Sequence, residues 1–248
     1  MFPAPRRPDG HDAVVSLVIP AHNEAQHIPS IVRTALHASL VGRVILVDDG
    51  STDGTAEAVA ALAAADTRLE VVHTTVNRGK AGALLLGIHA AGTDLIAFID
   101  ADLIGLAAQH IDDLIRPVPT GDCDMTLGLF RGGRLHTDLA HRTAAFLSGQ
   151  RCLRWELFRD TPLLEGSRYG LEVALSLQAR RHKLGVRRVP WTGVTHVTQL
   201  ERHGAARGYV SYLRMYAEIL LYLARLGLDP LIRRVLLPAW SARIGRAH

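Results

Sequence analysis

The stretch that decides the fold is Leu95-Ile96-Ala97-Phe98-Ile99-Asp100-Ala101-Asp102, five apolar residues followed at once by two carboxylates. A continuous apolar run of this length is typical of a strand of a parallel sheet that is buried on both faces. Asp100 and Asp102 then follow the carboxyl end of the strand, where open α/β sheets bind their ligands. The stretch therefore predicts an α/β domain with an acidic site at the tip of a buried strand.

The same order of strand, polar turn and helix repeats through the first hundred residues. The predicted strands are Val14–Ile19, Val44–Val47, Leu69–His73 and Leu95–Ile99. The predicted helices between them are Ala25–Ala38, Thr55–Ala64 with Asp53 as its N-cap, and Ala81–Ala91. Strands that alternate with helices in this way predict right-handed crossovers and a parallel sheet.

Polar residues follow three of these strands. They are the pair Asn23 and Glu24, the run Asp48 to Ser51, and the pair Asp100 and Asp102. Because the carboxyl ends of parallel strands meet at one edge of a sheet, we expect the three clusters to converge on a single crevice.

The second half of the chain is less regular. Its predicted elements are a strand at Met125–Phe130, a helix at Asp138–Leu147, a helix at Arg168–His182, a strand at Val186–Val189, and helices at Ala205–Leu226 and Pro230–Leu237. We expect a flexible N-terminus over residues 1–12, one domain over residues 13–200 and C-terminal amphipathic helices over residues 201–248.

The composition is that of a globular protein with a sizeable core. The chain has 248 residues, of which 48% are hydrophobic, and a formal net charge of +4. Cys123 and Cys152 match no zinc-binding spacing, and two scattered thiols fit a reducing compartment. The basic, Pro-rich start does not resemble a signal peptide, and no apolar run reaches the roughly 18 residues that span a bilayer. We therefore expect a cytoplasmic protein, with peripheral contact to the inner face of the membrane as an option.

Asp100 and Asp102 have the chemistry of a cation site. Mg²⁺ and Mn²⁺ prefer carboxylate and phosphate oxygens, and such an ion neutralises charge on a diphosphate leaving group. The Asp-x-Asp pattern alone is common, and two solvated loop carboxylates are the alternative. The position of the pair after a buried strand favours the metal site.

Four further residues join this hypothesis, each with a structural alternative. Lys80 follows Gly79 at a predicted helix start, where free N–H groups and a lysine favour phosphate; the alternative is a surface lysine. Glu24 and Asp49 can accept hydrogen bonds from a nucleoside, or can complement a helix dipole. His196 follows the last strand and can complete a metal site, although most of the 13 histidines are expected to be structural or exposed.

Two glutamates could act on an acceptor hydroxyl. Glu165 and Glu172 lie before and within the predicted helix Arg168–His182, and either could orient the hydroxyl or act as a base. The alternatives are helix-dipole complementation for Glu165 and an exposed helical position for Glu172.

Four motifs resemble those of glycosyltransferase family 2 and its GT-A-fold relatives, in order and in spacing. They are Val18-Ile19-Pro20-Ala21-His22-Asn23-Glu24, Val47-Asp48-Asp49-Gly50-Ser51-Thr52-Asp53-Gly54-Thr55, Asn77-Arg78-Gly79-Lys80 and Asp100-Ala101-Asp102. The resemblance implies a GT-A fold, an α/β architecture with a mixed, mostly parallel sheet flanked by helices. It also implies a nucleotide-sugar half over residues 13–103 and an acceptor half over residues 104–200.

The resemblance assigns roles to individual residues. It implies a nucleotide-sugar site formed by Pro20, Ala21, Asn23, Glu24, Asp49, Ser51, Gly79, Lys80, Asp100 and Ala101. It implies that Asp102 binds Mg²⁺ or Mn²⁺. Lys80, Asp100 and Glu172 are the expected catalytic residues.

The second half is similar to a narrower group, the glucosyl-3-phosphoglycerate synthases. Leu147-Ser148-Gly149-Gln150-Arg151 looks like their acceptor-loop motif, which implies acceptor contacts from Ser148, Gly149, Gln150 and Arg151. Tyr169 to Leu175 looks like their sugar-site helix, and Val194-Thr195-His196 falls where they carry a metal-binding histidine. These matches imply transfer of a hexose from a UDP-sugar, UDP-glucose above all, to a small phosphorylated acceptor.

The rival predictions concern the acceptor and the reaction. An apolar stripe at helical spacing within Tyr209–Leu226, flanked by arginines, suits a membrane interface and hence a polyprenyl-phosphate acceptor; packing on the domain or a homodimer interface are the alternatives. A nucleotidyltransferase of similar build would need a Gly- and Arg-rich loop after the first strand, where this chain has His22-Asn23-Glu24. A non-catalytic nucleotide-sugar-binding module is the third possibility. We expect no nucleic acid partner.

Overall fold

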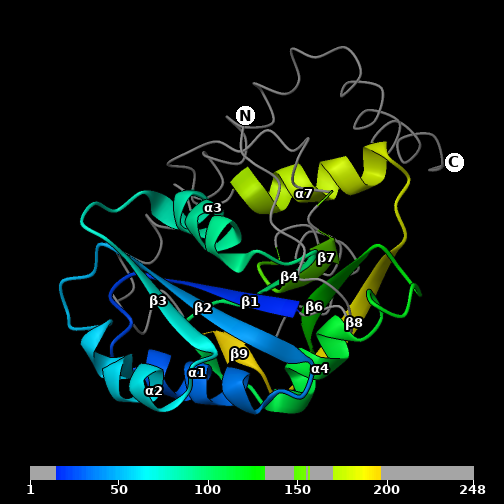
Figure 1. Ribbon diagram of the computed structural model, residues 1–248. Helices are drawn as coiled ribbons and strands as arrows, with labels where there is room; N and C mark the ends of the chain where they lie inside the picture. The colour runs from blue at the N-terminus through cyan, green and yellow to red at the C-terminus, as the bar shows by residue number, and fades with distance from the viewer. Residues whose placement is uncertain (1–14, 132–147, 155, 157–169, 197–248) are drawn as a thin grey trace, which may run out of the picture. The chain divides into compact units, whose positions relative to one another are not determined.

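The computed structural model describes residues 15–131, 148–154, 156 and 170–196, drawn in colour in Figure 1. The described residues all belong to one compact unit, Met1–Thr198. The predicted helices Asp138–Leu147, Ala205–Leu226 and Pro230–Leu237 lie outside them, as do residues 1–12 and 201–248. The division of the chain into three parts therefore stays a prediction.

A seven-stranded mixed sheet runs through the domain in the order β3-β2-β1-β4-β7-β6-β8 (Figure 1). The strands are β1 (Val15–Ala21), β2 (Val41–Asp49), β3 (Leu69–Thr74), β4 (Leu95–Phe98), β6 (Met125–Arg131), β7 (Arg151–Arg154) and β8 (Val186–Thr192). β3, β2, β1 and β4 are parallel, β7 is antiparallel to both β4 and β6, and β8 is parallel to β6. A separate two-stranded sheet pairs β5 (Leu103–Ile104) with β9 (Thr195–His196).

Helices cover both faces of the sheet, as Figure 1 shows. One face carries α1 (Ile28–His37), a 3₁₀ helix (Glu57–Val59), α2 (Ala60–Ala65) and α4 (Ala108–Ile115); the other carries α3 (Gly79–Ala91) and α7 (Gly170–Arg181). The alternation of strand side chains explains the two cores: Leu17 and Ile19 of β1 pack with α1 and α4, whereas Val18 packs with α3 and α7. None of the described helices is both long enough and apolar enough to cross a membrane.

The predicted α/β fold with a mostly parallel sheet is confirmed, and the four predicted parallel strands are all present. The predicted start of the helix Thr55–Ala64 is wrong, and the carboxylate of Asp53 is not its N-cap. That carboxylate accepts the backbone N–H groups of Ala25 and Thr55 instead, and the 3₁₀ turn begins only at Glu57. An Asx-turn and a contact across the loop thus replace the local cap.

Candidate functional site

The turns after β1 and β2 are locked together. The backbone N–H of Asn23 donates to Oγ of Ser51 at 2.9 Å, and the N–H of Thr52 donates to Oδ1 of Asn23 at 2.9 Å. Asn23 has a φ of 57°, a left-handed conformation that asparagine tolerates better than most residues. Because β1 also pairs with β4, the turns after three strands lie along one edge, and the predicted convergence of the polar clusters is confirmed.

Asp48 and Asp49 at the end of β2 are buried and bind neighbouring turns. Asp48 accepts the N–H of Ser51 at 3.1 Å and faces Nδ1 of His73 at 2.9 Å. Asp49 accepts the N–H of Arg78 at 2.9 Å, which fixes the loop that leads into α3. Asp49 was predicted to contact the nucleoside or to complement a helix dipole, and its carboxylate in addition holds this loop in place.

Glu24 begins the segment that follows the first strand, and its side chain is largely buried, with 8% exposure. Its backbone N–H donates to Oγ1 of Thr55 at 2.9 Å. Pro20 and Ala21 end β1 just before it, and Ala21 is buried as well. The sequence did not predict that Asp53 and Thr55 accept hydrogen bonds from the backbone of Ala25 and Glu24. An Asp two residues before a Thr was the available signal.

Three residues could hold a metal ion. Each offers one ligand atom, and the three atoms lie within 4.8 Å of one another; the residues are Asp100, Asp102 and His196. The pairing of Leu103 with His196 in the β5–β9 ladder brings the histidine beside Asp102, 94 positions away in sequence. Two carboxylates suit Mn²⁺ or Mg²⁺. A neutral imidazole is a common metal ligand, so the donor set fits a divalent cation.

The charges around His196 favour its protonated form in the metal-free protein. Burial alone would lower its pKa, but the hydrogen bond to Asp102 and the charges of Asp100 and Asp102 outweigh burial, and the pKa of His196 is raised. Nδ1 of His196 lies 3.2 Å from Oδ1 of Asp102. A cation at this position would take the place of that proton.

Lys80 bridges two carboxylates from opposite halves of the chain. Its Nζ lies 2.6 Å from Oδ1 of Asp100 and 2.8 Å from Oε1 of Glu172. Burial would lower the pKa of Lys80, but the two carboxylates outweigh burial and raise it, so the ammonium stays charged. Burial likewise opposes the charge of Asp100, yet Lys80, His196 and Gln150 hold the pKa of that carboxyl below its usual value.

Glu172 lies in the first turn of α7 and is buried, with 3% exposure. The structure therefore contradicts the exposed helical position considered as its alternative role. Its Oε2 is buried and has no hydrogen-bond partner among the described residues. An unsatisfied buried carboxylate oxygen is costly, and a hydroxyl of a bound molecule could satisfy it.

The segment 148–151 reaches the same cluster from β7. The Nε2 amide of Gln150 donates to Oδ2 of Asp100 at 2.7 Å, and Oγ of Ser148 donates to the carbonyl of Gly128 at 2.7 Å. A Cβ at Gly149 would lie 2.5 Å from Nζ of Lys80, so a side chain there would require the ammonium to move. Arg151, expected in an acceptor loop, is the first residue of β7 and is 1% exposed.

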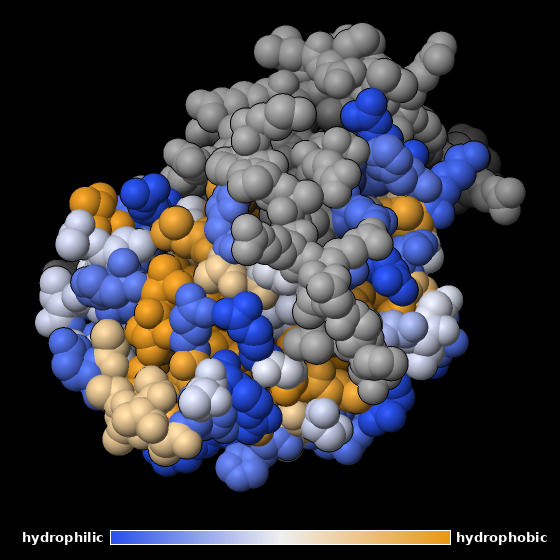
Figure 2. Space-filling model, in the orientation of Figure 1, coloured by the Kyte–Doolittle hydropathy of each residue, from blue (hydrophilic) through white to orange (hydrophobic). Residues whose placement is uncertain are grey.

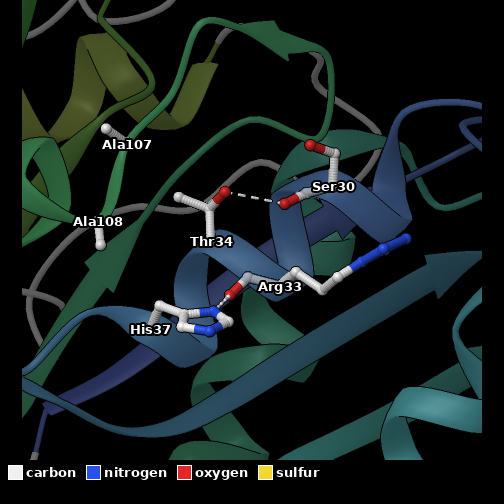
Figure 3. A pocket seen from close by; sticks show the side chains of 6 residues that line it. All are labelled: Ser30, Arg33, Thr34, His37, Ala107 and Ala108. Atoms are coloured by element: carbon white, nitrogen blue, oxygen red, sulfur yellow. Dashed lines mark hydrogen bonds between the residues drawn. The ribbon is translucent and has the colours of Figure 1, made fainter.

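A separate hollow lies between α1 and the start of α4, with a volume of about 310 Å³. Figure 3 shows its lining, in which the Arg33 side chain extends away from Ala107 and Ala108. His37 and Thr34 contact carbonyl groups of their own helix. The hollow contains none of the predicted site residues, so the edge that carries Asp100 remains the candidate site.

The comparisons with known proteins agree with this geometry. The sequence profile of glycosyl transferase family 2 matches residues 16–173. The chain belongs to this family. The match spans the turns after β1 and β2, Lys80, the Asp100–Asp102 pair and Glu172, and the predicted family is confirmed.

Curated proteins resemble the chain to different extents. Glucosyl-3-phosphoglycerate synthase of Mycobacterium tuberculosis is 31% identical over an aligned length of 194 residues, and the match covers 65% of this chain and 59% of that protein. Undecaprenyl-phosphate 4-deoxy-4-formamido-L-arabinose transferase of Yersinia enterocolitica is 38% identical over an aligned length of 95 residues, and the match covers 36% of this chain and 29% of that protein. The chain thus spans less than two thirds of the length of these curated relatives.

A solved structure of the mycobacterial synthase has the same fold. It contains Mn²⁺, UDP and glucosyl-3-phosphoglycerate, and it matches with a TM-score of 0.66 and 25% identity over 88% of this chain and 85% of that chain. The predicted GT-A fold of this family 2 member is confirmed.

Proposed function

We propose that this chain is a metal-dependent glycosyltransferase that transfers a hexose from a nucleotide-diphosphate sugar, UDP-glucose first, to a small phosphorylated acceptor. The observation that carries the proposal is the cluster of Asp100, Asp102 and His196 within 4.8 Å, beside Lys80, at the carboxyl ends of parallel strands. The mycobacterial relative, crystallised with UDP-glucose, Mn²⁺ and phosphoglyceric acid, supports the choice of donor and acceptor.

The nucleoside of the donor would lie over the turns after β1 and β2. Pro20, Ala21, Asn23, Glu24, Asp49 and Ser51 would form this part of the site. The hydrogen bonds that tie Asn23 to Ser51 support the proposal, because they hold the polar groups of two strand tips in place before a ligand binds.

The diphosphate would lie between the first turn of α3 and the metal cluster. Gly79 and Lys80 offer the start of a helix and an ammonium, both of which favour phosphate. Asp102 and His196, with Asp100 beside them, would hold Mg²⁺ or Mn²⁺, which supplies stabilisation of the diphosphate oxygens as the sugar departs. The raised pKa of Lys80 supports its role, since the side chain keeps its charge while it faces that leaving group.

The sugar and the acceptor would meet between Asp100, Ala101, Glu172 and the segment 148–151. Oε2 of Glu172, which has no hydrogen-bond partner among the described residues, can accept a hydrogen bond from a hydroxyl of the sugar or of the acceptor. Ser148 and Gly149 would offer main-chain contacts to the acceptor, while Gln150 and Arg151 hold the segment in place. Inversion would use Glu172 as a base, and retention would not need one, so NMR of the anomeric product decides the stereochemistry.

The proposal is tested by donor binding and turnover. UDP-, GDP- and ADP-sugars are compared by thermal shift with and without Mn²⁺, and transfer from the stabilising donor to 3-phosphoglycerate is then measured. We expect UDP-glucose to stabilise the protein in the presence of Mn²⁺, by mass action, and Asp102→Ala to abolish the effect. Asp94→Ala, an exposed carboxylate at the other end of β4, is the matched control. Equal stabilisation with and without Mn²⁺ in the wild-type protein would refute the proposal.

A polyprenyl-phosphate acceptor is the second candidate, favoured by the match to the undecaprenyl-phosphate transferase. Membrane contact and a homodimer through residues 201–248 belong to this candidate and concern residues that the structure does not describe. In the described part, the exposed large hydrophobic residues Val76, Ile104 and Val186 come from three separate segments. Figure 2 likewise shows hydrophobic and hydrophilic side chains intermixed on the face in view. Transfer to undecaprenyl phosphate but not to 3-phosphoglycerate would favour this candidate.

A further inference from the structure

The imidazole of His196 packs against an aromatic side chain that none of the predicted roles included. The ring centroids of Phe130 and His196 lie 4.7 Å apart, with an angle of 85° between the ring planes. An edge-to-face approach of this kind is one of the two arrangements that aromatic pairs prefer. Phe130 therefore contacts the ring of the metal-site histidine without being a ligand itself.

Phe130 is held from behind by the core. It is the direct partner of Trp191 in the β6–β8 ladder, and the two ring centroids are 6.1 Å apart. Trp191 is fully buried and its ring also lies 5.6 Å from that of His110 in α4. The ring that meets His196 is thus backed by a packed side chain rather than by solvent.

Gly128 makes room for this arrangement. It precedes Phe130 by two positions in β6, so both face the same side of the sheet. A Cβ at Gly128 would lie 3.2 Å from Cε2 of Trp191 and 2.9 Å from Cβ of Gln150. The absence of a side chain at Gly128 lets the ring of Trp191 approach the strand and support Phe130.

Within the described residues, the other contacts of His196 leave the orientation of its ring weakly fixed. The β9 strand has only two residues, and its pairing with β5 fixes the backbone of His196 but not the rotation of the imidazole. The polar contact to Oδ1 of Asp102 at 3.2 Å involves an atom that is itself a candidate metal ligand. The contact with Phe130 involves no candidate ligand atom, so a bound cation would not compete for it.

We propose that Phe130 is a positioning residue for the metal site. Its ring holds the imidazole of His196 in the orientation that binds the cation, and Trp191 in turn holds the ring of Phe130. This inference rests on the proposed function, since it matters only if His196 binds the cation. Mutation of the outer-shell partners of metal ligands typically reduces metal affinity or activity by ten- to a hundredfold.

The test is a Mn²⁺ titration of the metal-free full-length protein, with free Mn²⁺ counted by electron paramagnetic resonance. Phe130→Leu and Phe130→Met remove the ring and keep an apolar side chain, and we expect the Kd for Mn²⁺ to rise about tenfold. Phe130→Tyr keeps the ring and should restore an affinity close to that of the wild-type protein. The control is Leu129→Ala on the same strand, whose side chain packs against the opposite core; it should lower stability without changing the Kd.

The outcomes separate this inference from the proposed function. If His196→Gln weakens Mn²⁺ binding but a folded Phe130→Leu or Phe130→Met variant binds as tightly as the wild type, the role of Phe130 is refuted and the metal site stands. If His196→Gln and Asp102→Ala both bind like the wild type, the metal site and the proposed function fall together. If Leu129→Ala weakens binding as much as Phe130→Leu does, the effect is general packing, and the role of Phe130 is again refuted.

Discussion

The ammonium of Lys80 lies 2.6 Å from Oδ1 of Asp100, and this ion pair joins the start of α3 to the tip of β4. The same ammonium lies 2.8 Å from Glu172 on α7, so one cation ties the two halves of the domain together at the candidate site. Both carboxylates are largely shielded from solvent, with side-chain exposures of 16% for Asp100 and 4% for Glu172. Lys80 therefore stabilises the protein and contributes to the proposed chemistry.

Replacing Lys80 should impair both properties. In Lys80→Met, two shielded carboxylates lose their partner, and we expect a loss of about 1–3 kcal/mol in the free energy of unfolding, measured in urea. The rate of sugar transfer should fall roughly a hundredfold or more, because a charge that faces the leaving group is removed. Lys183→Met is the matched control, since Lys183 is exposed. An unchanged stability together with an unchanged rate in Lys80→Met would contradict the assigned role.

A side chain at Gly149 should disturb the ion pair between Lys80 and Asp100. A Cβ there would lie 2.5 Å from Nζ of Lys80 and 2.8 Å from Oδ2 of Asp100, and the ion pair leaves these atoms little freedom to move. We expect Gly149→Ala to lower the transfer rate by about a hundredfold, as misplacement of a reacting group does. Gly185→Ala, where the nearest atom would be 3.5 Å away, is the control and should retain full activity. Full activity in Gly149→Ala would show that the pair can shift without cost.

The sequence predicted the first half of the sheet well because its signals are local. Each of β1, β2 and β4 is an apolar run that ends at a polar turn, and parallel pairing then forces those turns to one edge. The acidic pair and Lys80 followed from their positions in this pattern. The resemblance to glycosyltransferase family 2 supplied the individual roles.

The second half depends on long-range pairing, which local signals do not encode. β7 has four residues, two of them arginines, and it is a strand only because β4 and β6 lie on either side. The helix α4 and the two-residue strands β5 and β9 were not predicted. Gln150 was assigned to the acceptor, whereas its amide donates to Asp100. The contact between Phe130 and His196 likewise joins segments whose spacing carries no signal.

The ion pair predicts how stability depends on pH. The pKa of Asp100 is held below its usual value in the folded protein, so its contribution is fully present above the unfolded-state pKa of about 4. It is lost as the pH falls through the lower folded-state pKa, because the unfolded chain takes up the proton first. We expect the difference in unfolding free energy between wild type and Asp100→Asn to shrink below about pH 4. Urea titrations at several pH values measure it, and a difference that grows on acidification would contradict the assignment.

The charge of Arg151 should contribute to the stability of the protein, although the side chain is buried. It is 1% exposed, its Nε donates to the carbonyl of Ser148 at 2.8 Å and its guanidinium donates to Oγ of Ser176 at 2.9 Å. Burial lowers the pKa of Arg151 to about 10, although the negative charge of Glu172 acts to raise it. The guanidinium therefore remains protonated at neutral pH. Its charge therefore offsets part of the negative charge of the buried Glu172.

Replacing Arg151 by an uncharged residue should destabilise the protein more than replacing it by lysine. We expect Arg151→Met to lose about 3 kcal/mol in the free energy of unfolding, because it leaves a buried carboxylate without one of its compensating charges. Arg151→Lys keeps the charge and should recover part of that loss, although an ammonium cannot donate in the planar fork that reaches Ser148 and Ser176. Arg154→Met, on the same strand but exposed, is the control and should change stability by less than about 0.5 kcal/mol. Equal losses for the Met and Lys variants of Arg151 would show that packing, and not charge, is what the residue contributes.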